Sequence, residues 1–434
     1  MDGSNPNGVF EIFAAFLKLG LTSFGGPIAH LGYFREEFVV RRKWLNDSAF
    51  ADVVALCQFL PGPASSQVGF VLGLFRGGGL LGGIAAWTAF TLPSAILLLA
   101  FAYGAASFSG PIGQGVIHGL KLVAVAVVAQ AIWGMARTLT PDRPRIGIAL
   151  AAVAAAVFLN STVGQIGAIA GGALLGIVLG RDGGIQSTHH LNFPVGHRSA
   201  LCALILFTAL FVAPPLLHAI AGGQAFLLFD AFYRSGALVF GGGHVVLPLL
   251  ETAVVHPGWV SHEAFLAGYG ATQAVPGPLF TFAAYLGAAA LPEPNGVMGA
   301  VIALVALFLP GLLLVYGTLP FWDGLRRRPL AQAAMKGANA AVVGILAAAF
   351  YSPVWITAVA TPSDFFLALA GFLFLTVWKA PPWVVVIGLA AVGAAFGSIK
   401  ECRYQEAALD VISLGKSFEK AQLRRPLCAA HTVL

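Results

Sequence analysis

Charged side chains are scarce in this chain of 434 residues, in which Asp, Glu, Lys and Arg together make up only 10%. Soluble domains carry about 25%, and 58% of the residues here are hydrophobic. The chain is therefore expected to be a polytopic membrane protein and not a water-soluble globule. Common enzyme motifs are also lacking, since there is no P-loop, no HExxH and no GxSxG. We expect neither enzymatic activity nor a cofactor.

Cysteines are few as well, and the four of them show no CxxC spacing. Neither a disulfide framework nor a metal site is expected. The start of the chain lacks a basic segment and a small-residue cleavage site, so we expect no removable signal peptide. The formal charge is +6, but the basic residues lie in short loops between apolar runs. This distribution indicates membrane topology and not nucleic-acid binding.

Apolar runs of the length that crosses a bilayer, about 20 residues, recur between Phe10 and Ile399. They do not alternate with polar residues, which excludes a β-barrel. We therefore predict an all-α fold. The expected full-length crossings are residues 80–103, 113–136, 146–159, 163–179, 200–220, 297–319, 331–351, 365–378 and 383–397.

Four further apolar segments are interrupted by glycine and proline. Each arm beside an interruption is too short to cross a bilayer, so the sequence predicts re-entrant-type helical hairpins. Broken crossings stay as the alternative for the two Pro-Gly-Pro breaks. Non-helical backbone at such depth requires protein or a polar cavity around it. The breaks are Gly25-Gly26-Pro27 between residues 10–24 and 28–40, Pro61-Gly62-Pro63 between 49–60 and 64–75, Gly241-Gly242-Gly243 between 226–240 and 245–255, and Pro276-Gly277-Pro278 between 264–275 and 279–291.

The two halves of the chain carry these breaks in the same order, so the sequence contains an internal repeat. Phe24-Gly25-Gly26 returns as Phe240-Gly241-Gly242, and the Pro-Gly-Pro motif also returns. We place the N-terminal repeat at 1–181, a cytoplasmic loop and a connecting transmembrane helix at 182–222, the second repeat at 223–399, and a polar tail without an assigned role at 400–434.

Loop charges indicate that the second repeat is inverted. Residues 41–43 are all basic, whereas the equivalent loop near Trp259 has no Lys or Arg; conversely, residues 326–328 are all Arg, whereas the loop near Ser107 is uncharged. Basic loops are cytoplasmic by the positive-inside rule, so equivalent elements have opposite orientations. We expect a cytoplasmic N-terminus, an outside C-terminus, and transport by rocking of one repeat against the other.

The breaks also predict an anion site. Each starts a half-helix whose free N–H groups carry about half a positive charge, and such starts bind anions. Lys18 and Arg234, equivalent in the two copies, are candidate anion-attracting charges. We predict that the anion binds at and beside the breaks, at Lys18, Phe24, Gly25, Gly26, Pro27, Gln58, Pro61, Gly62, Pro63, Ser65, Ser66, Arg234, Phe240, Gly241, Gly242, Gly243, His244, Gln273, Pro276, Gly277, Pro278 and Thr281.

Each of these assignments has a structural alternative. The two cations could snorkel to the interface, and Gln58 and Gln273 could join helices by hydrogen bonds. His30 and His244 are candidates for proton coupling, but a lone helix histidine is more often simply hydrogen-bonded. The glycines could serve close helix packing, although this explains Pro-Gly-Pro poorly.

Four motifs are similar to those of the chromate ion transporter family in its long-chain, two-domain form. They are SFGGPIAHL (residues 23–31), LCQFLPGPASSQ (56–67), VFGGGHVVLP (239–248) and ATQAVPGPLFTFAAYLG (271–287). The resemblance covers about residues 10–399. It implies export of chromate across a bacterial inner membrane, coupled to protons and conferring chromate resistance.

On this basis we expect a secondary transporter for the tetrahedral dianion chromate. A sulfate or general oxyanion transporter, an anion channel and a non-transporting sensor stay as alternatives. The expected partners are chromate or sulfate, protons and membrane lipid, with no nucleic acid, and a homodimer is left open.

Overall fold

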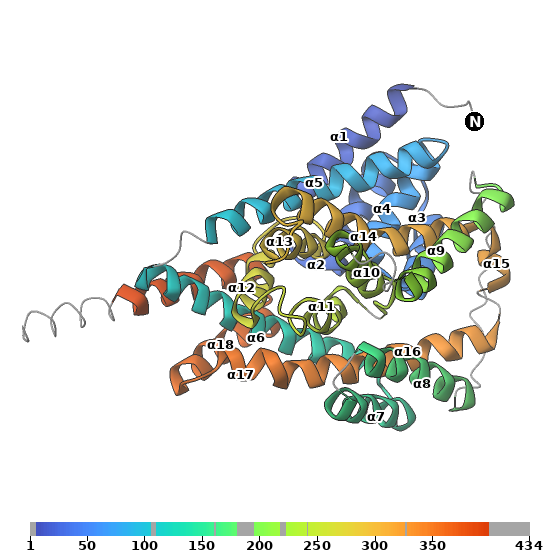
Figure 1. Cartoon of the computed structure of the whole chain (residues 1–434). Helices are drawn as coiled ribbons and strands as arrows, with labels where there is room; N and C mark the ends of the chain where they lie inside the picture. The colour runs from blue at the N-terminus through green and yellow to red at the C-terminus, as the bar shows by residue number, and fades with distance from the viewer. Residues whose placement is uncertain are drawn as a thin grey trace, which may run out of the picture.

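The computed structural model describes residues 6–105, 110–159, 162–179, 195–217, 223–240, 242–325 and 328–398, and within them the chain forms only helices. Figure 1 shows them as one bundle. Five helices are long and apolar enough to cross a membrane, at Leu80–Gly104, Pro111–Leu139, His197–Pro214, Gly296–Phe321 and Pro329–Ala358. The predicted all-α membrane fold is confirmed.

The two repeats place their helices in the same order. The first contains α1 (Pro6–Thr22), α2 (Gly26–Phe34), a π-helical turn (Arg35–Arg41), α3 (Asp47–Phe59), α4 (Ala64–Arg76), α5 (Leu80–Ala105), α6 (Pro111–Leu139), α7 (Arg143–Leu159) and α8 (Thr162–Leu179). The connecting helix is α9 (His197–Leu217).

The second repeat begins with α10 (Gln224–Ala237), a 3-10 turn (Gly243–Val245), α11 (Val246–Val254), α12 (His262–Thr272), a 3-10 turn (Leu279–Thr281) and α13 (Phe282–Ala289). Its remaining helices are α14 (Gly296–Thr318), a 3-10 turn (Leu319–Phe321), α15 (Trp322–Leu325), α16 (Pro329–Ala349), a π-helical turn (Phe350–Trp355), α17 (Ile356–Ala358), α18 (Pro362–Thr376) and an unlabelled helix at Pro382–Ser398.

All four predicted breaks interrupt helices. Gly25 and Gly26 have φ of +99° and +80°, and Gly62 and Gly277 have φ of +120° and +99°. These values lie where side chains are disfavoured, so glycine is the residue that allows the chain to turn there. Proline lies in the first turn of α2, a position that needs no backbone N–H donor. Gly241 lies outside the described residues.

The four shortest expected crossings form helices at least as long as predicted. The helix α7 has 17 residues, α8 has 18 and α18 has 15, and the last helix spans Pro382–Ser398. These lengths lie near the lower end of the range of about 17–25 residues that crosses a bilayer, so their role as full-length crossings stays a prediction. They form two short pairs, one in each repeat.

These short pairs pack on the opposite repeat. Helices α7 and α8 of the first repeat lie along α16, whereas α18 of the second repeat lies along α6. Close approach depends on glycine, because a Cβ at Gly337 would overlap the carbonyl oxygen of Gly172, and one at Gly119 would overlap that of Leu389. Movement of the repeats as two separate bodies would break these contacts.

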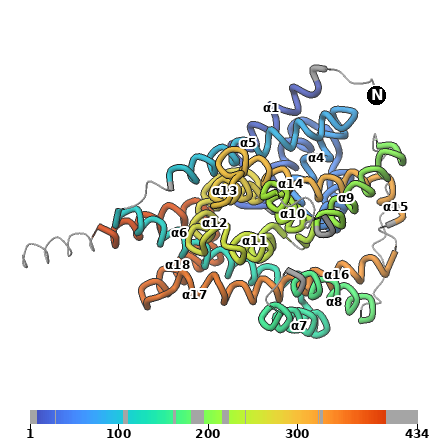
Figure 2. Tube along the Cα trace, viewed as in Figure 1, coloured from blue at the N-terminus to red at the C-terminus, as the bar shows by residue number. Residues whose placement is uncertain are grey.

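The bundle divides instead into two groups of helices that each draw on both repeats. The first, called here the broken-helix layer, contains α1, α4, α5, α10, α13 and α14; the second, the support layer, contains α6, α7, α8, α16, α17 and α18. The two groups occupy the upper and lower sides of Figures 1 and 2. Helix α12 lies between them and packs on α6.

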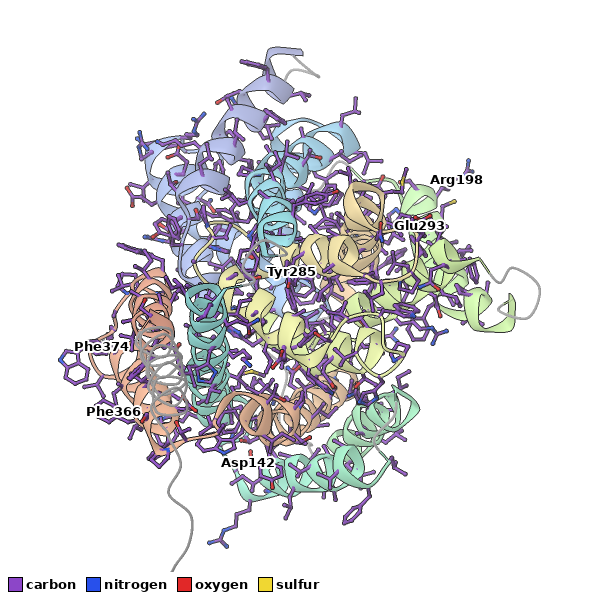
Figure 3. All side chains as sticks on the ribbon, turned by 60° about the vertical axis from the view of Figure 1, so that its left-hand side comes forward. Asp142, Arg198, Tyr285, Glu293, Phe366 and Phe374 are labelled. Carbon is purple, nitrogen blue, oxygen red and sulfur yellow. The ribbon has the colours of Figure 1, made fainter. Side chains whose placement is uncertain are left out.

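Apolar side chains cover the outside of the support layer. Phe366 and Phe374 project from α18 at the rim of the molecule (Figure 3) and are 67% and 49% exposed. Such residues fit a surface that faces lipid. Tyr285 lies near the middle in the same view and is only 2% exposed.

Candidate functional site

The four breaks meet at the centre of the molecule, and the two repeats are joined there by reciprocal hydrogen bonds. The Gly62 N–H donates to the Val239 carbonyl at 2.7 Å, and the Gly277 N–H donates to the Ser23 carbonyl at 2.9 Å. Ser23 and Val239 each directly precede a Phe-Gly-Gly motif. Each Pro-Gly-Pro break therefore contacts the Phe-Gly-Gly break of the other repeat.

The Phe-Gly-Gly breaks also contact each other. A Cβ at Gly243 would lie 3.2 Å from Pro27 Cγ and 3.5 Å from a methyl carbon of Leu279. Pro27 and Gly243 are equivalent positions of the two repeats, so the pseudo-twofold axis passes between them. The structure thus brings all four breaks to one place, which is called here the central junction.

Helices that start at the central junction lack side-chain caps. No side chain accepts from the first N–H groups after Gly25, Pro63, Gly242 or Pro278 among the described residues. Away from the junction some starts are capped, because Asn46 accepts from the Ala49 N–H and Ser261 from the Ala264 N–H. The starts of α6, α10, α14 and α16 have no side-chain cap either.

The absence of a cap has a physical consequence. The first N–H groups of a helix have no partner within the helix, and a buried donor without a partner costs about 1–3 kcal/mol. A capping side chain removes that cost where one is present. A start without a cap can instead offer its donors to an anion.

Several buried hydroxyl and amide groups surround the junction. Ser65 and Ser66 lie in the first turn of α4 and are 3% and 1% exposed. The hydroxyls of Ser66 and Ser23 have no hydrogen-bond partner among the described residues. Thr281 donates to the Pro278 carbonyl at 2.7 Å. The serine hydroxyls can therefore donate to a ligand.

Gln67 connects the first Pro-Gly-Pro break to the second repeat. Its Nε2 donates to the carbonyls of Pro61 and Gly311, both at 2.9 Å. A Cβ at Gly311 would lie 2.9 Å from a ring carbon of Pro63, so α14 passes close to the break. The amide of Gln67 positions the backbone of the junction.

The two candidate histidines lie beside the junction and have polar neighbours. His30 is fully buried, with Nδ1 3.4 Å from Ser65 Oγ and its ring edge-on to Phe90 at 5.3 Å. His244 Nδ1 lies 2.7 Å from the Tyr269 hydroxyl. Both contacts agree with the structural alternative of hydrogen-bonded histidines, and a role in proton coupling stays a prediction.

The two candidate cations have acidic partners. Lys18 Nζ lies 4.0 Å from the Glu37 carboxylate, and its side chain is 55% exposed. Arg234 donates to Asp230 at 2.8 Å and to the Phe211 carbonyl at 2.8 Å, with its guanidinium 5.0 Å from the Phe211 ring. Their described contacts are with these partners and not with the residues of the junction.

Other predicted positions lie around the junction with weaker contacts. The Gln273 amide lies 3.5 Å from the Tyr269 carbonyl, and Gln58 is exposed. Phe24 lies 6.5 Å from the Trp383 ring, between ring centres, and Phe240 is half-buried. Pro276, at the start of the second Pro-Gly-Pro break, is buried.

Basic residues near the end of α2 form an ion-pair cluster around Glu37. Arg41 and Arg42 donate to its carboxylate at 2.6 and 2.7 Å. Burial alone would raise the pKa of Glu37, but the hydrogen bond from Arg42 and the charges of Arg41 and Lys18 hold that pKa below its usual value. This cluster holds the first repeat together on the side of its basic loop.

Two ionisable side chains on α6, His118 and Lys121, are not among the predicted anion-binding or proton-coupling residues. His118 Nε2 lies 2.7 Å from Asp364, and Lys121 Nζ lies 3.3 Å from Glu263. Both partners belong to the second repeat. A signal was present in the sequence, because an ionisable residue inside an expected crossing is a functional candidate. Within the described residues no group of three or more His, Cys, Asp or Glu could hold a metal ion.

Comparisons with known proteins place this arrangement in a family. The model of the family described as Chromate transporter matches residues 10–177 and 226–394, one match for each repeat. The Chromate transport protein of Pseudomonas aeruginosa is 31% identical over 400 residues, covering 88% of this chain and 90% of the relative.

Two further relatives carry similar names. The Probable chromate transport protein of Synechococcus elongatus is 28% identical, covering 77% of this chain and 81% of the relative. The Chromate transport protein of Cupriavidus metallidurans is 26% identical, covering 88% and 92%. No solved structure matches this chain.

Proposed function

This chain belongs to the chromate transporter family, and from that premise we propose that it exports chromate across the bacterial inner membrane as a secondary active transporter. Family membership supports transport of chromate across a membrane. The direction of transport, the proton coupling and the role in chromate resistance are proposals that go further.

The observation that carries the proposal is the meeting of four uncapped helix starts at the central junction. One helix start stabilises a nearby anion by about 0.3–1 kcal/mol when exposed and up to about 2 kcal/mol when partly buried. Four such starts can hold a dianion without a side-chain cation beside it. The tetrahedral oxygens of chromate can then accept hydrogen bonds from several directions, including from Ser66.

We assign four roles to predicted residues. The glycines and prolines of the breaks shape the backbone, and Ser65, Ser66 and Thr281 supply hydroxyls. Lys18 and Arg234 attract the anion from a distance, because each is paired with a carboxylate. The fourth role, proton coupling, is given to His30 and His244.

The moving parts proposed are the two layers and not the two repeats. Contacts between α7, α8 and α16, and between α18 and α6, would break if whole repeats rocked. Displacement of the broken-helix layer against the support layer leaves these contacts intact. A membrane potential that is negative inside favours export of a dianion by about 4.6 kcal/mol per 100 mV.

The orientation that we propose for the chain in the membrane is based on the loop charges. We propose a cytoplasmic N-terminus and an outside C-terminus, with repeats at 1–181 and 223–399. Sulfate has the same shape and charge as chromate, so a general oxyanion transporter is the main alternative. A channel is the other alternative, and it predicts flux that does not saturate.

Inside-out vesicles that contain the full chain test the proposal. Export in the cell corresponds to accumulation in these vesicles, so we expect saturable accumulation of labelled chromate that falls when the proton gradient is collapsed. Accumulation no greater than in vesicles without the protein contradicts the proposal. Complete competition by equimolar sulfate supports the general oxyanion alternative.

A further inference from the structure

Lys121 is a buried cation in the long helix α6. It is 8% exposed, and the stretch from Leu120 to Val128 around it is fully buried. Its ammonium lies 3.3 Å from Glu263, whose side chain is 71% exposed. A charge inside a membrane helix is costly to insert, and a pair with an exposed carboxylate contributes little to stability. Stability alone therefore does not account for a lysine here.

The position of Glu263 has a local structural explanation, whereas that of Lys121 has none. Glu263 lies in the first turn of α12, after the capping residue Ser261. An acidic residue is favourable at a helix start because of the helix dipole. Glu263 would stabilise α12 without Lys121, whereas Lys121 has no comparable local role in α6.

The equivalent position in the other repeat is also polar. Gly119 and Gly337 are equivalent glycines of α6 and α16, so Lys121 corresponds to Asn339. The Asn339 Oδ1 is buried and has no hydrogen-bond partner among the described residues. Each of the two long support helices therefore carries a buried polar side chain at the same position.

The equivalent helices α12 and α3 pack differently on the support layer. In α12 every residue from Phe265 to Thr272 is buried, and a Cβ at Gly270 would overlap the carbonyl oxygen of Leu120, next to Lys121. In α3, Ala51 and Ala55 are exposed. Helix α12 packs on α6, whereas α3 packs on α4 and the π-helical turn at Arg35–Arg41 and not to a comparable extent on α16.

Inverted repeats alternate by exchanging their conformations. In the opposite state α12 would take the packing that α3 has here, and would leave α6. That movement would separate Glu263 from Lys121 and expose the Lys121 ammonium to the space that α12 leaves.

We propose that Lys121 is a second anion-contact residue, which lies between the central junction and the face where α12 begins. The Glu263 carboxylate pairs with the Lys121 ammonium while α12 packs on α6. The inference rests on the proposed transport of chromate. An anion leaving the central junction would exchange places with the Glu263 carboxylate, so that Lys121 is never left without a negative partner.

Initial rates of chromate accumulation in inside-out vesicles test this assignment. For Lys121→Gln we expect kcat to fall about tenfold or more, with the amount of protein in the membrane unchanged. Glu263→Gln removes the partner of Lys121 but keeps the anion contact, so it should slow transport by a smaller factor than Lys121→Gln. Arg198→Gln is the matched control, because Arg198 is exposed at the edge of the molecule (Figure 3) and should keep the full rate.

The double variant Lys121→Gln with Glu263→Gln is decisive, because it leaves no unpaired charge even if the single lysine variant folds poorly. We expect it to be as slow as Lys121→Gln. If the double variant regains the wild-type rate, the pair only joins α6 to α12. That result overturns the inference about Lys121 and leaves the proposed function standing. Wild-type vesicles that do not accumulate chromate overturn the proposed function and this inference with it.

Discussion

Substitution of Gly62 by alanine perturbs the central junction at one point. Gly62 has φ of +120°, and an added Cβ would lie 2.9 Å from Gln67 Nε2 and 3.0 Å from Gly311 Cα. Backbone strain costs about 1–3 kcal/mol, and the overlap adds about 1 kcal/mol. We therefore expect Gly62→Ala to lower the free energy of unfolding by about 2–4 kcal/mol.

The matched control is Gly78→Ala. Gly78 also has a positive φ, of +66°, but an added Cβ meets no atom within 4 Å, so its cost is backbone strain of about 1–2 kcal/mol. Unfolding in detergent measures both variants, and chromate accumulation in vesicles measures the effect on the junction. Equal stability and equal transport for Gly62→Ala and Gly78→Ala would refute the packing described here.

Three further predictions concern other contacts. Gln67→Leu removes two hydrogen bonds to buried carbonyls and should cost about 1–3 kcal/mol; no loss in an unfolding experiment would contradict the positioning role. The lowered pKa of Glu37 means that its ion pairs stabilise the protein above the usual pKa of a glutamate and are lost as the pH falls through the lowered pKa; Glu37→Gln should be less stable at pH 7 and should lack this acid-dependent loss. Gly337→Ala should weaken the packing of α16 on α8 and lower the melting temperature. Gly147→Ala on α7, where a Cβ meets nothing within 4 Å, should not lower it, because alanine favours a helix over glycine.

The helices and the breaks were predictable from the sequence, because glycine and proline act locally. Positive φ at Gly25 and Gly62 needs glycine whatever surrounds it, so the motifs alone located the turns. Helix ends fell within a few residues of the expected arms. The helices α7 and α18 also lie within three residues of the expected segments 146–159 and 365–378.

Contacts between the repeats were not predictable in the same way. The bond from Gly62 to Val239 joins segments far apart in the chain, and a single sequence does not show which breaks meet. The packing of α18 on α6 is of the same kind, since all of these helices are apolar. Lys121 could have been singled out as an ionisable residue inside a crossing, but its partner Glu263 comes from the other repeat.

Chromium itself allows a direct test of the central claim that an anion binds at the central junction. The measurement is an anomalous difference map from crystals of the full chain grown with chromate, recorded near the chromium absorption edge. We expect one principal peak among the helix starts that follow Gly25, Pro63, Gly242 and Pro278. A principal peak beside the basic loop at residues 41–43, with none at the junction, would contradict the central claim.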